Sequence, residues 1–582
     1  MNLLKQVILN KIEKYKHLPY GTVIIHAKHK KTKYQLFLLT DESVKNKTII
    51  NLLAKWRNHH QKWFPSQFKV TKEGTKKWLK EKVIEVPDRL LFMIRVNNKY
   101  LGHVGLFRFD FDNVMCELDN IVRGESTIPG IMTSACLEIM NWGKQKLGIK
   151  WYQLTTSSDN IKAVQLYQRL GFREVKRVLM VQVKKNGGTE WVEAKKNHSE
   201  KMTRYHLVMI NKKIAFAGPS ITEKEVEYAV EGVISGFYET YDQHAKKLEK
   251  AIADFLGVKY TIATHCCTLA LHLACAAIGL KPGDEVICTD FSWIATAYSI
   301  VYTGATPVFV DIDPDTWCID PKAIEKAVTK KTKAIMLVHT FGYPADMDEI
   351  MRIARKNNLK VIEDAAPALG AEYKGKKVGT IGDIGCFSFQ GAKVTVTGEG
   401  GIFVTNDKKI YEKALMLATM GRTDSQAVFW SDSVGYQYTI SNLSAALALA
   451  QVERIDELVA KKRQIFDWYY KRLKDFDRIK LIKEKKGYKS NYCYPSMLLN
   501  DDVLISREEL LKKLRGLNIH ARPAFPNMGQ FPPFKNEFKS KLKFENPVAT
   551  KVAKRGICLP AAANLTEDDV LFVCNSLKKI VS

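Results

Sequence analysis

The chain has 582 residues, 46% of them hydrophobic and 26% charged, so it is long enough for several domains and unlike a disordered, collagen-like or coiled-coil protein. Its apolar runs are shorter than the ~18 residues that span a membrane, and it has no signal-peptide pattern, so no membrane segment is expected. Its 11 scattered cysteines form no CxxC pair, which predicts a cytoplasmic protein without a metal site. The net charge of +28 is uneven, because residues 1–212 carry 39 Lys and Arg against 18 Asp and Glu.

The first 211 residues alternate strand-like and helix-like patterns. Strands are expected at 34–39, 90–96, 101–109, 116–122, 151–156 and 173–183, and helices near 44–56, 132–146 and 161–170. This order predicts an α+β unit of about 180 residues. A polar stretch at 195–201 and a strand at 205–210 then lead to a domain boundary near residue 211.

Strand–loop–helix units repeat beyond that boundary. Strands are expected at 260–264, 285–288, 334–338 and 360–364, and helices at 268–279, 294–302 and 347–357. Strands that alternate with helices predict an α/β domain with a mostly parallel sheet covered on both faces.

A lysine stands between two glycine-bearing turns in this second unit. Lys393 ends the run FSFQGAK at 387–393, and TGEGG follows at 397–401. Desolvation beside buried aromatic residues would lower the lysine pKa and free the amine to attack a carbonyl. Asp364 ends an apolar strand, where open α/β sheets collect ligands; it can hold a pyridine nitrogen protonated or simply cap the next turn.

Two more segments follow strands of the same unit. Cys267 and Thr268 open a helix rich in Ala and Leu, whose unsatisfied N–H groups can bind a phosphate together with the Thr268 hydroxyl. Trp293 follows the next strand, where an indole can lie over a flat heterocycle or pack in the core.

These motifs together resemble the DegT-like sugar-nucleotide aminotransferases, which have the aspartate-aminotransferase fold. The resemblance covers residues 213–582 and includes GPSIT at 218–222, GDEVI at 283–287, IEDAA at 362–366 and Leu559-Pro560. It implies pyridoxal 5'-phosphate (PLP) as cofactor and a smaller C-terminal α+β subdomain.

The resemblance also implies a role for each motif residue. Lys393 would form the Schiff base with the cofactor and move the proton during transamination, and Asp364 would pair with the pyridinium nitrogen. Trp293 would stack on the ring, while Thr268 and Ser388 would hold the phosphate at the helix start that Cys267 opens.

GYQY at 435–438 resembles the family element that reaches the neighbouring subunit's cofactor, which implies a homodimer, although Gln437 stands where Asn or Lys is common. Relatives that remove a sugar hydroxyl carry histidine at the Schiff-base position, so Lys393 favours transamination. ARPAFP at 521–526 and LPAAANL at 559–565 look most like perosamine-synthase-type members, which aminate C4 of a nucleotide-linked 4-keto-6-deoxyhexose.

The run NIKAVQLYQRLGF at 160–172 follows a strand and opens a helix in the first unit. Asn160 and Tyr167 share one helix face, where a phenol can protonate a departing thiolate; in isolation they would be a helix cap and a core residue. The run resembles the NxxAxxLYxxxGF element of GNAT acetyltransferases, and WRN at 56–58 recurs in the branch that acts on amino sugars or protein amines. This resemblance implies acetyl-CoA as cosubstrate.

The pyrophosphate loop of that family should lie at 123–132, where Gly130 is kept but Met132 replaces a second small residue. An amine must lose its proton before it attacks a thioester, so a base on the central strands is expected. Glu117 and Asp119 share one strand face and either could be this base, with His103 as a third candidate; a solvated strand face is the alternative.

We therefore expect an N-terminal extension at 1–33, a GNAT-like domain at 34–211, a large PLP-binding domain at 212–455 and a small subdomain at 456–582. The leading hypothesis is a bifunctional enzyme for surface glycans. It would aminate an NDP-4-keto-6-deoxyhexose with glutamate as amino donor and then acetylate the new amine.

Two alternatives stay open at this point. The GNAT domain could be degenerate or acetylate another amine. The basic first third could instead be a nucleic-acid-binding module attached to a cofactor-sensing domain, but its strand-rich pattern does not offer a helix-turn-helix. We therefore expect no nucleic-acid partner, and a surface with dispersed lysines.

Overall fold

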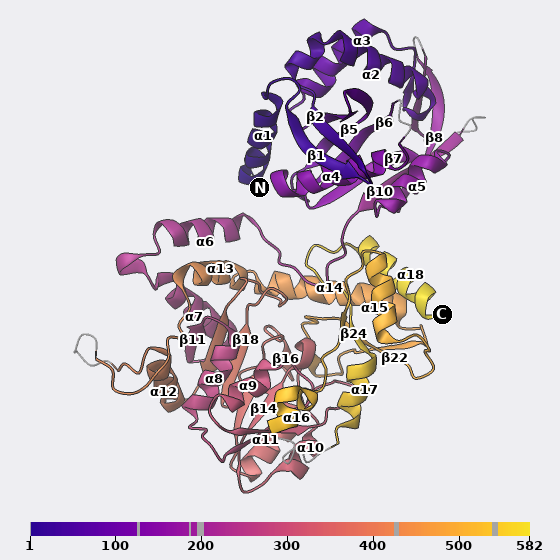
Figure 1. Ribbon diagram of the computed structural model, residues 1–582. Helices are drawn as coiled ribbons and strands as arrows, with labels where there is room; N and C mark the ends of the chain where they lie inside the picture. The colour runs from indigo at the N-terminus through magenta and orange to yellow at the C-terminus, as the bar shows by residue number, and fades with distance from the viewer. Residues whose placement is uncertain (1, 125–127, 186–187, 195–202, 424–429, 538–544) are drawn as a thin grey trace. The chain divides into compact units, whose positions relative to one another are not determined.

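The chain divides into two compact units, Met1–Lys213 and Ile214–Ser582, in a computed structural model that describes residues 2–124, 128–185, 188–194, 203–423, 430–537 and 545–582 (Figure 1). The division falls two residues beyond the boundary expected from the sequence. Each unit has its own buried core, so each is described by itself.

The first unit is a mixed sheet with helices, as the α+β prediction requires. Its strand order is β1-β2-β4-β5-β6-β7-β10-β8-β9-β3. The strands are β1 (Val23–His29), β2 (Thr32–Leu38), β3 (Ser66–Gln67), β4 (Leu90–Val96), β5 (Lys99–Asp110), β6 (Met115–Arg123), β7 (Trp151–Ser157), β8 (Arg173–Lys185), β9 (Gly188–Glu193) and β10 (Thr203–Asn211). The α-helices are α1 (Asn2–Lys16), α2 (Lys47–His59), α3 (Lys72–Leu79), α4 (Ile131–Trp142) and α5 (Ile161–Arg169).

Residues 1–33, expected to be an extension, contribute α1 and β1 to this unit. Ile8 and Ile12 stand one helical turn apart and are buried in the core, and β1 pairs with β2 along its length. The charged residues of α1 other than Lys16 face solvent, which hides its apolar stripe in the sequence. Lys16 is buried and donates to the Ile84 carbonyl (2.9 Å).

Two central strands of the first unit separate partway along their length. The parallel strands β6 and β7 are in register from Met115 to Glu117, opposite Trp151 to Gln153, and then part. Because β6 continues to Arg123, its second half opens beside a cavity instead of a neighbouring β7 backbone. This separation places the strand that carries Glu117 and Asp119 at the wall of the cavity.

The second unit is built on a seven-stranded sheet in the order β11-β19-β18-β15-β14-β12-β13. Its strands are β11 (Tyr260–Thr264), β12 (Glu285–Thr289), β13 (Thr306–Val310), β14 (Thr332–Val338), β15 (Lys360–Asp364), β18 (Ile384–Ser388) and β19 (Gly401–Thr405). The helices around it are α6 (Glu223–Ile234), α7 (Gln243–Leu256), α8 (Cys267–Ala277), α9 (Ala295–Val301), α10 (Pro321–Ala327), α11 (Met347–Lys356), α12 (Lys408–Ala418) and α13 (Asn442–Val452).

Helices cover both faces of this sheet, as expected (Figure 1). Ile335 and Leu337 of β14 belong to one core cluster, whereas Met336 between them belongs to another. Successive strand residues point to opposite faces, so each face has its own hydrophobic layer. Only β19 runs antiparallel to its two neighbours, β11 and β18.

The C-terminal part of the second unit is a smaller α+β layer. It contains α14 (Ile455–Leu473), β20 (Ile479–Leu481), β22 (Ser496–Leu499), α15 (Arg507–Gly516), β23 (Arg522–Pro523), α16 (Pro532–Glu537), α17 (Pro547–Arg555), β24 (Gly556–Cys558) and α18 (Glu567–Val581). Three two-residue strands, β16 (Glu372–Tyr373), β17 (Lys376–Lys377) and β21 (Tyr488–Lys489), form a separate sheet. The fold-class prediction for both units is confirmed.

One buried carboxyl of this unit gives a stability test. Glu249 of α7 accepts a hydrogen bond from the Ala263 N–H (2.8 Å), and burial raises its pKa to about 7. The folded state therefore holds a proton that the unfolded state releases, so stability falls as pH rises from the ordinary glutamate range to about 7. Glu249→Gln should raise the melting temperature above the wild type at about pH 8, but not at about pH 5. Equal differences at both pH values would contradict this assignment.

Candidate active sites

The loop that carries Lys393 is closed by its own backbone. The Phe389 N–H donates to the Gly400 carbonyl (2.9 Å), and the Thr397 N–H donates to the Phe389 carbonyl (2.8 Å). Inside the loop, the Lys393 N–H donates to the Gln390 carbonyl (2.9 Å). These bonds hold the lysine at the end of β18, where the sequence motif placed it.

Asp364 ends β15 and is buried, with 4% of its surface exposed. Its carboxylate accepts hydrogen bonds from the Thr296 hydroxyl (2.7 Å) and the Ala366 N–H (3.1 Å). Burial raises the pKa of Asp364, while the nearby Lys393 amine acts in the opposite direction. The structure therefore brings Lys393 and Asp364 together, and the described residues offer this carboxylate no ion pair within 4 Å.

Glu363, the neighbour of Asp364, points to the opposite side of β15 and binds four N–H groups. Its carboxylate accepts from the backbone N–H groups of Gly379 (2.6 Å), Ile381 (2.7 Å) and Gly382 (2.5 Å), and it lies 2.9 Å from His339 Nε2.

His339 connects this carboxylate to Asp364. Because His339 Nδ1 accepts from the Ala345 N–H (3.0 Å), Nε2 carries the proton and donates to Glu363. The His339 backbone N–H donates to the Asp364 carbonyl (3.1 Å). This pair fixes the strand end that presents Asp364, and sequence reasoning missed it; the adjacent acids at 363 and 364 were the available signal.

The start of α8 lies beside the first residue of β19. A side-chain carbon at Gly401 would come within 2.5 Å of the Cys267 nitrogen, so only glycine permits this approach. The first N–H groups of a helix have no acceptor within it, which leaves those of Cys267 and Thr268 for a phosphate. The Cys267 thiol is buried and burial raises its pKa, so its contribution is the backbone N–H.

The other three residues predicted to contact the cofactor, Ser388, Trp293 and Gln437, differ in exposure. Ser388 is buried, and its hydroxyl accepts from the Gln390 N–H (3.3 Å). Trp293 is 63% exposed, and Gln437 is exposed and donates to the Thr439 hydroxyl (3.1 Å). The ring stacking expected of Trp293 and the intersubunit role expected of Gln437 stay predictions.

The residues of this site fit PLP by their chemistry. A buried carboxylate without an ion pair suits a protonated ring nitrogen, and a helix start suits a phosphate. The Lys393 amine lowers the pKa of both Asp364 and Cys267, so it lies near both of these anchoring points. Asp364, Thr268, Ser388 and Lys393 would hold the cofactor.

A cavity of about 1590 Å³ opens in the first unit. It brings together the predicted acetyltransferase residues, namely Glu117, Asp119, Gly130, Asn160 and Tyr167. His103 and Met132 also line it.

Tyr167 lies within α5, and Asn160 is the residue that caps its start. The Asn160 side chain caps the helix by accepting from the Ala163 N–H (3.4 Å). Tyr167 is buried, and burial raises the pKa of its phenol, with Cys136 and Asp119 acting in the same direction. The phenol therefore keeps its proton at neutral pH and can donate it.

The two acids on β6 each face an arginine. Glu117 lies 3.2 Å from Arg108, and Asp119 lies 2.5 Å from Arg89. Burial and the nearby Asp119 raise the pKa of Glu117, which makes Glu117 a better proton acceptor than an ordinary glutamate. His103 donates from Nδ1 to the Asn120 carbonyl (2.8 Å), and burial lowers its pKa to about 4, so it stays neutral.

Gly130 precedes α4 with a left-handed φ of +85°. A side-chain carbon there would lie 2.9 Å from His29 Nε2, so the turn requires glycine. The first residues of α4, Ile131 and Met132, line the cavity together with Gly130, and the first N–H groups of a helix have no acceptor within it. Residues 125–127 of the expected pyrophosphate loop lie outside the described residues.

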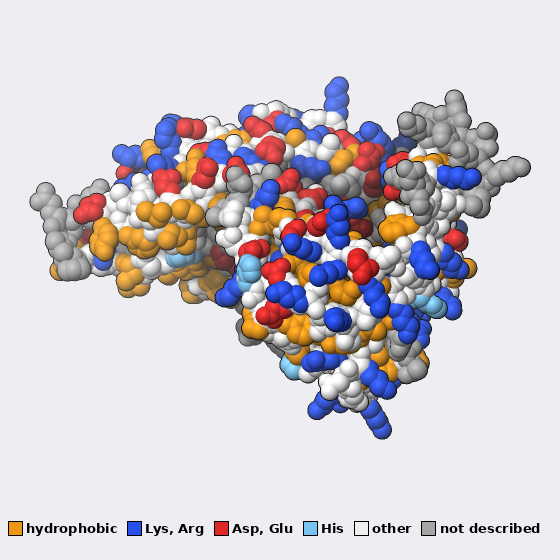
Figure 2. Space-filling model, turned by 90° about the horizontal axis from the view of Figure 1, so that it is seen from above, with side chains coloured by type: hydrophobic (Ala, Val, Ile, Leu, Met, Phe, Trp, Pro, Cys, Tyr) orange, Lys and Arg blue, Asp and Glu red, His pale blue; other side chains and the backbone are white. Residues whose placement is uncertain are grey.

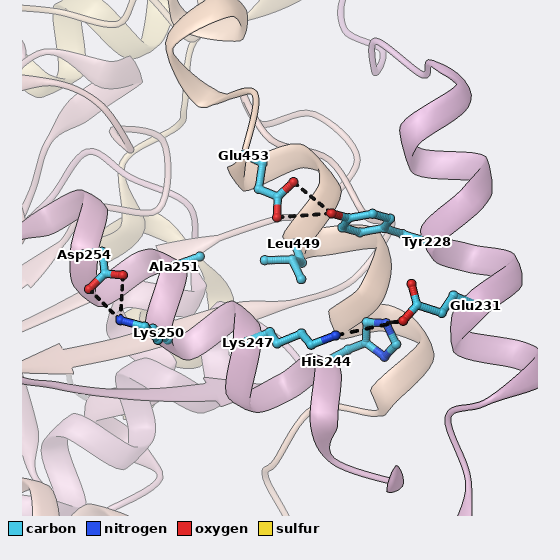
Figure 3. Close-up of a pocket in the computed structure, with 9 residues that line it drawn as sticks. All are labelled: Tyr228, Glu231, His244, Lys247, Lys250, Ala251, Asp254, Leu449 and Glu453. Carbon is cyan, nitrogen blue, oxygen red and sulfur yellow. Dashed lines mark hydrogen bonds and ion pairs between the residues drawn. The ribbon is translucent and has the colours of Figure 1, made fainter.

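A smaller cavity of about 250 Å³ lies among α6, α7 and α13 (Figure 3). Its polar groups pair with one another: the Tyr228 hydroxyl donates to Glu453 (3.0 Å), and Lys250 lies 3.0 Å from Asp254. None of the predicted site residues lines it. It is a hollow between paired surface groups rather than a reaction site.

The surface charge is dispersed. On the face that Figure 2 shows, Lys and Arg side chains alternate with acidic and apolar ones instead of gathering in one stripe. Among the described residues, none of the helices has the length and hydropathy needed to cross a bilayer.

The fold and the two sites define an aminotransferase joined to an acetyltransferase-type domain. The family model "DegT/DnrJ/EryC1/StrS aminotransferase family" matches residues 219–578, and the model "Acetyltransferase (GNAT) domain" matches residues 46–173. The chain belongs to the DegT/DnrJ/EryC1/StrS aminotransferase family and carries a GNAT domain. The nucleic-acid alternative for the first third is therefore wrong, because that segment is a GNAT domain.

Aminotransferases with known names align with the second unit over most of its length. The chain is 39% identical to the GDP-perosamine synthase of Escherichia coli O157:H7 over 364 residues, which is 62% of this chain and 97% of that protein. It is 38% identical to the dTDP-4-amino-4,6-dideoxy-D-glucose transaminase of Shigella dysenteriae over 337 residues, 58% of this chain and 89% of that protein. The solved structure of the Helicobacter pylori aminotransferase PseC, involved in pseudoaminic acid biosynthesis, matches with a TM-score of 0.60, 26% identity and coverage of 64% and 99%.

Proposed function

We propose that this chain is a bifunctional cytoplasmic enzyme of surface-glycan biosynthesis. Its second unit transfers an amino group from glutamate to C4 of an NDP-4-keto-6-deoxyhexose, and its first unit acetylates the new amine with acetyl-CoA. The observation that carries the proposal is the presence in one chain of a Lys393–Asp364 site and a GNAT cavity that contains Tyr167.

The amination half rests on Lys393 and Asp364. PLP, when bound, supplies an electron-withdrawing ring that stores the amino group between donor and acceptor. Lys393 Nζ takes the proton from the amine-bearing carbon of glutamate and returns a proton to C4 of the sugar. The buried Asp364 carboxylate, held in place by Thr296 and the Ala366 N–H, would pair with the protonated ring nitrogen of the bound cofactor.

The nucleotide sugar is supported by the named relatives, which act on GDP- and dTDP-linked sugars. The C4 position follows from the same relatives and from the motifs near the C-terminus. The nucleotide itself is left to experiment.

The acetylation half uses the cavity of the first unit. The sugar amine gives its proton to Glu117, directly or through a water, or to Asp119, and its nitrogen then attacks the thioester carbonyl. The C–N bond forms as the C–S bond breaks, and the Tyr167 hydroxyl protonates the departing thiolate. The products are a 4-acetamido sugar and coenzyme A.

An exposed apolar surface supports the proposed homodimer. It follows the end of α6 and includes Val233, Ile234, Phe237, Tyr238 and Tyr241, which are between 56% and 88% exposed. A contiguous set of exposed apolar and aromatic residues marks a protein interface. A second copy would cover it and bring its Gln437 segment toward the cofactor site.

Product analysis tests both halves at once. The full chain, loaded with PLP, is incubated with glutamate, acetyl-CoA and a panel of GDP-, UDP- and dTDP-linked 4-keto-6-deoxyhexoses, and products are identified by mass spectrometry. Tyr167→Phe should accumulate the amine and slow acetamide formation about 10²- to 10⁴-fold, because the thiolate loses its proton donor. The exposed Tyr205 provides the control Tyr205→Phe, which should behave like the wild type.

Each result has a separate meaning. If the wild type forms no amine from any keto-sugar, the amination half fails. If it forms amine without acetamide, the acetylation half fails and the GNAT domain serves another amine or none. Unchanged acetamide formation in Tyr167→Phe would contradict only the proton-donor role of Tyr167 and would leave the rest of the proposal intact.

A further inference from the structure

Among the described residues of the first unit, two arginines have buried guanidinium nitrogens without a hydrogen-bond partner. These are Nη1 of Arg57 and both Nε and Nη2 of Arg204. The Arg57 guanidinium lies 3.5 Å from the ring centroid of Phe64, and that of Arg204 lies 4.1 Å from the ring centroid of Trp191. Aromatic stacking holds each group flat, and the buried N–H groups have no acceptor among the described residues.

Both arginines are anchored to one short segment, residues 62–66. Arg57 Nη2 donates to the Ser66 carbonyl (2.7 Å), and Arg204 Nη1 donates to the Lys62 carbonyl (3.2 Å). Burial lowers the pKa of Arg57 to about 10, and no carboxylate of the described residues counteracts this effect. Burial also lowers the pKa of Arg204, but the nearby Asp159 acts in the opposite direction. A buried cation without a counter-ion is costly, and a bound anion would offset this cost.

Arg57 lines the large cavity of the first unit from α2. Leu53, Arg57 and His60 follow each other at helical spacing and form one wall. The whole lining contains eight Lys and Arg side chains but three Asp and Glu. Arg89 and Arg108 are paired with two of those acids, so Arg57 is not needed to balance them.

The carbonyl that accepts from Arg57 and the residues beside the expected acetyl-CoA loop belong to strands at opposite ends of the strand order. The Ser66 carbonyl belongs to β3 at one end of the sheet, whereas His29 Nε2 contacts the Pro129 carbonyl beside Gly130 from the β1 end. The end of α2 nevertheless contacts the start of that loop, because His60 Nε2 lies 2.7 Å from the Arg123 carbonyl. The KM for acetyl-CoA is therefore the measurement that separates an acceptor site at Arg57 from a coenzyme site.

We propose that Arg57 binds the diphosphate of a nucleoside-diphosphate-linked amino sugar, so that the acetyltransferase accepts its substrate before the sugar leaves the nucleotide. The planar guanidinium can donate two parallel hydrogen bonds to phosphate oxygens. Arg204 is a positioning residue, which holds segment 62–66 against the Arg57 side chain. This inference rests on the proposed acetylation and adds the chemical class of its acceptor.

Kinetics with two acceptors test the inference in the full, PLP-loaded chain. One acceptor is the nucleotide-linked 4-amino sugar, and the other is the methyl glycoside of the same amino sugar. Arg57→Gln should raise KM for the nucleotide-linked acceptor about 10- to 100-fold, with a small change in kcat and none in KM for acetyl-CoA. KM for the glycoside should not change, Arg57→Lys should restore part of the loss, and the exposed Lys76→Gln should match the wild type.

Calorimetric titration with GDP and UDP provides a readout independent of turnover. The wild type should bind nucleoside diphosphate at two sites per chain, one in each unit, and Arg57→Gln should retain one. Unfolding curves of Arg57→Gln and Arg57→Lys show whether the variants are folded, and the conservative variant carries the test if the first is not.

Four outcomes would overturn the inference. They are equal KM for the two acceptors, a higher KM for acetyl-CoA in Arg57→Gln, preferential acetylation of a lysine peptide, and one nucleotide site in the wild type. If the wild type acetylates neither sugar, the proposed acetylation fails. Loss of one nucleotide site in Arg57→Gln would then still support a diphosphate site at Arg57.

Discussion

Replacing Lys393 by alanine should abolish amine formation, with a loss of at least about 10³-fold, because the amine that moves the substrate proton is removed. Borohydride treatment of the wild type with PLP should attach the cofactor to the peptide that contains Lys393, and the variant should leave that peptide unlabelled. Acetylation of a supplied amino sugar should continue in Lys393→Ala, because its residues lie in the first unit.

The exposed Lys413 offers a matched control. Lys413→Ala should keep full amine formation and the labelled peptide. Retained transamination in Lys393→Ala, or labelling at another lysine in the wild type, would overturn the assignment of the site.

Asp364→Asn should lower amine formation roughly 10²- to 10³-fold, since the amide keeps the shape of the carboxylate but not its charge. Thr296 and Ala366 now donate to the two carboxylate oxygens, and an amide can retain one of these bonds. Cofactor binding should weaken less than turnover, which separates the electronic role of the charge from simple anchoring. Steady-state rates and PLP titration measure the two effects.

Asp348 is an exposed acid paired with Lys374 and serves as the control for charge loss. Asp348→Asn should leave both rate and PLP affinity unchanged. A fully active Asp364→Asn enzyme would show that the ring nitrogen does not need this negative charge.

Much of the second unit could be predicted because its information is local. The strands at Tyr260–Thr264 and Lys360–Asp364 have the expected limits, and the motifs around Lys393 and Asp364 predicted their proximity. In the first unit, Asn160 and Tyr167 line the same cavity, Asn160 as the cap of α5 and Tyr167 from within the helix.

Other features depend on contacts between distant segments. Glu363 meets His339 and the N–H groups of residues 379–382, which lie 16 to 24 residues away in the chain. Arg57 was visible only as part of the WRN motif, since its unpaired nitrogen results from how segment 62–66 and two aromatic rings fold around it. Neither arrangement leaves a periodic pattern in the sequence.

The four N–H groups around Glu363 have a consequence for how mutational surveys of this enzyme are interpreted. A survey scored by activity alone would rank Glu363 with the reactive groups, although its carboxylate faces a turn of its own backbone. Replacing Glu363 would release that turn and the strand end together. The enzyme would then lose activity because its local structure is lost, although no reactive group has been removed. Hydrogen exchange at the Gly379, Ile381 and Gly382 amides of a Glu363 variant would distinguish the two causes. Slow exchange would mean that the turn is intact, and fast exchange would mean that it has been released.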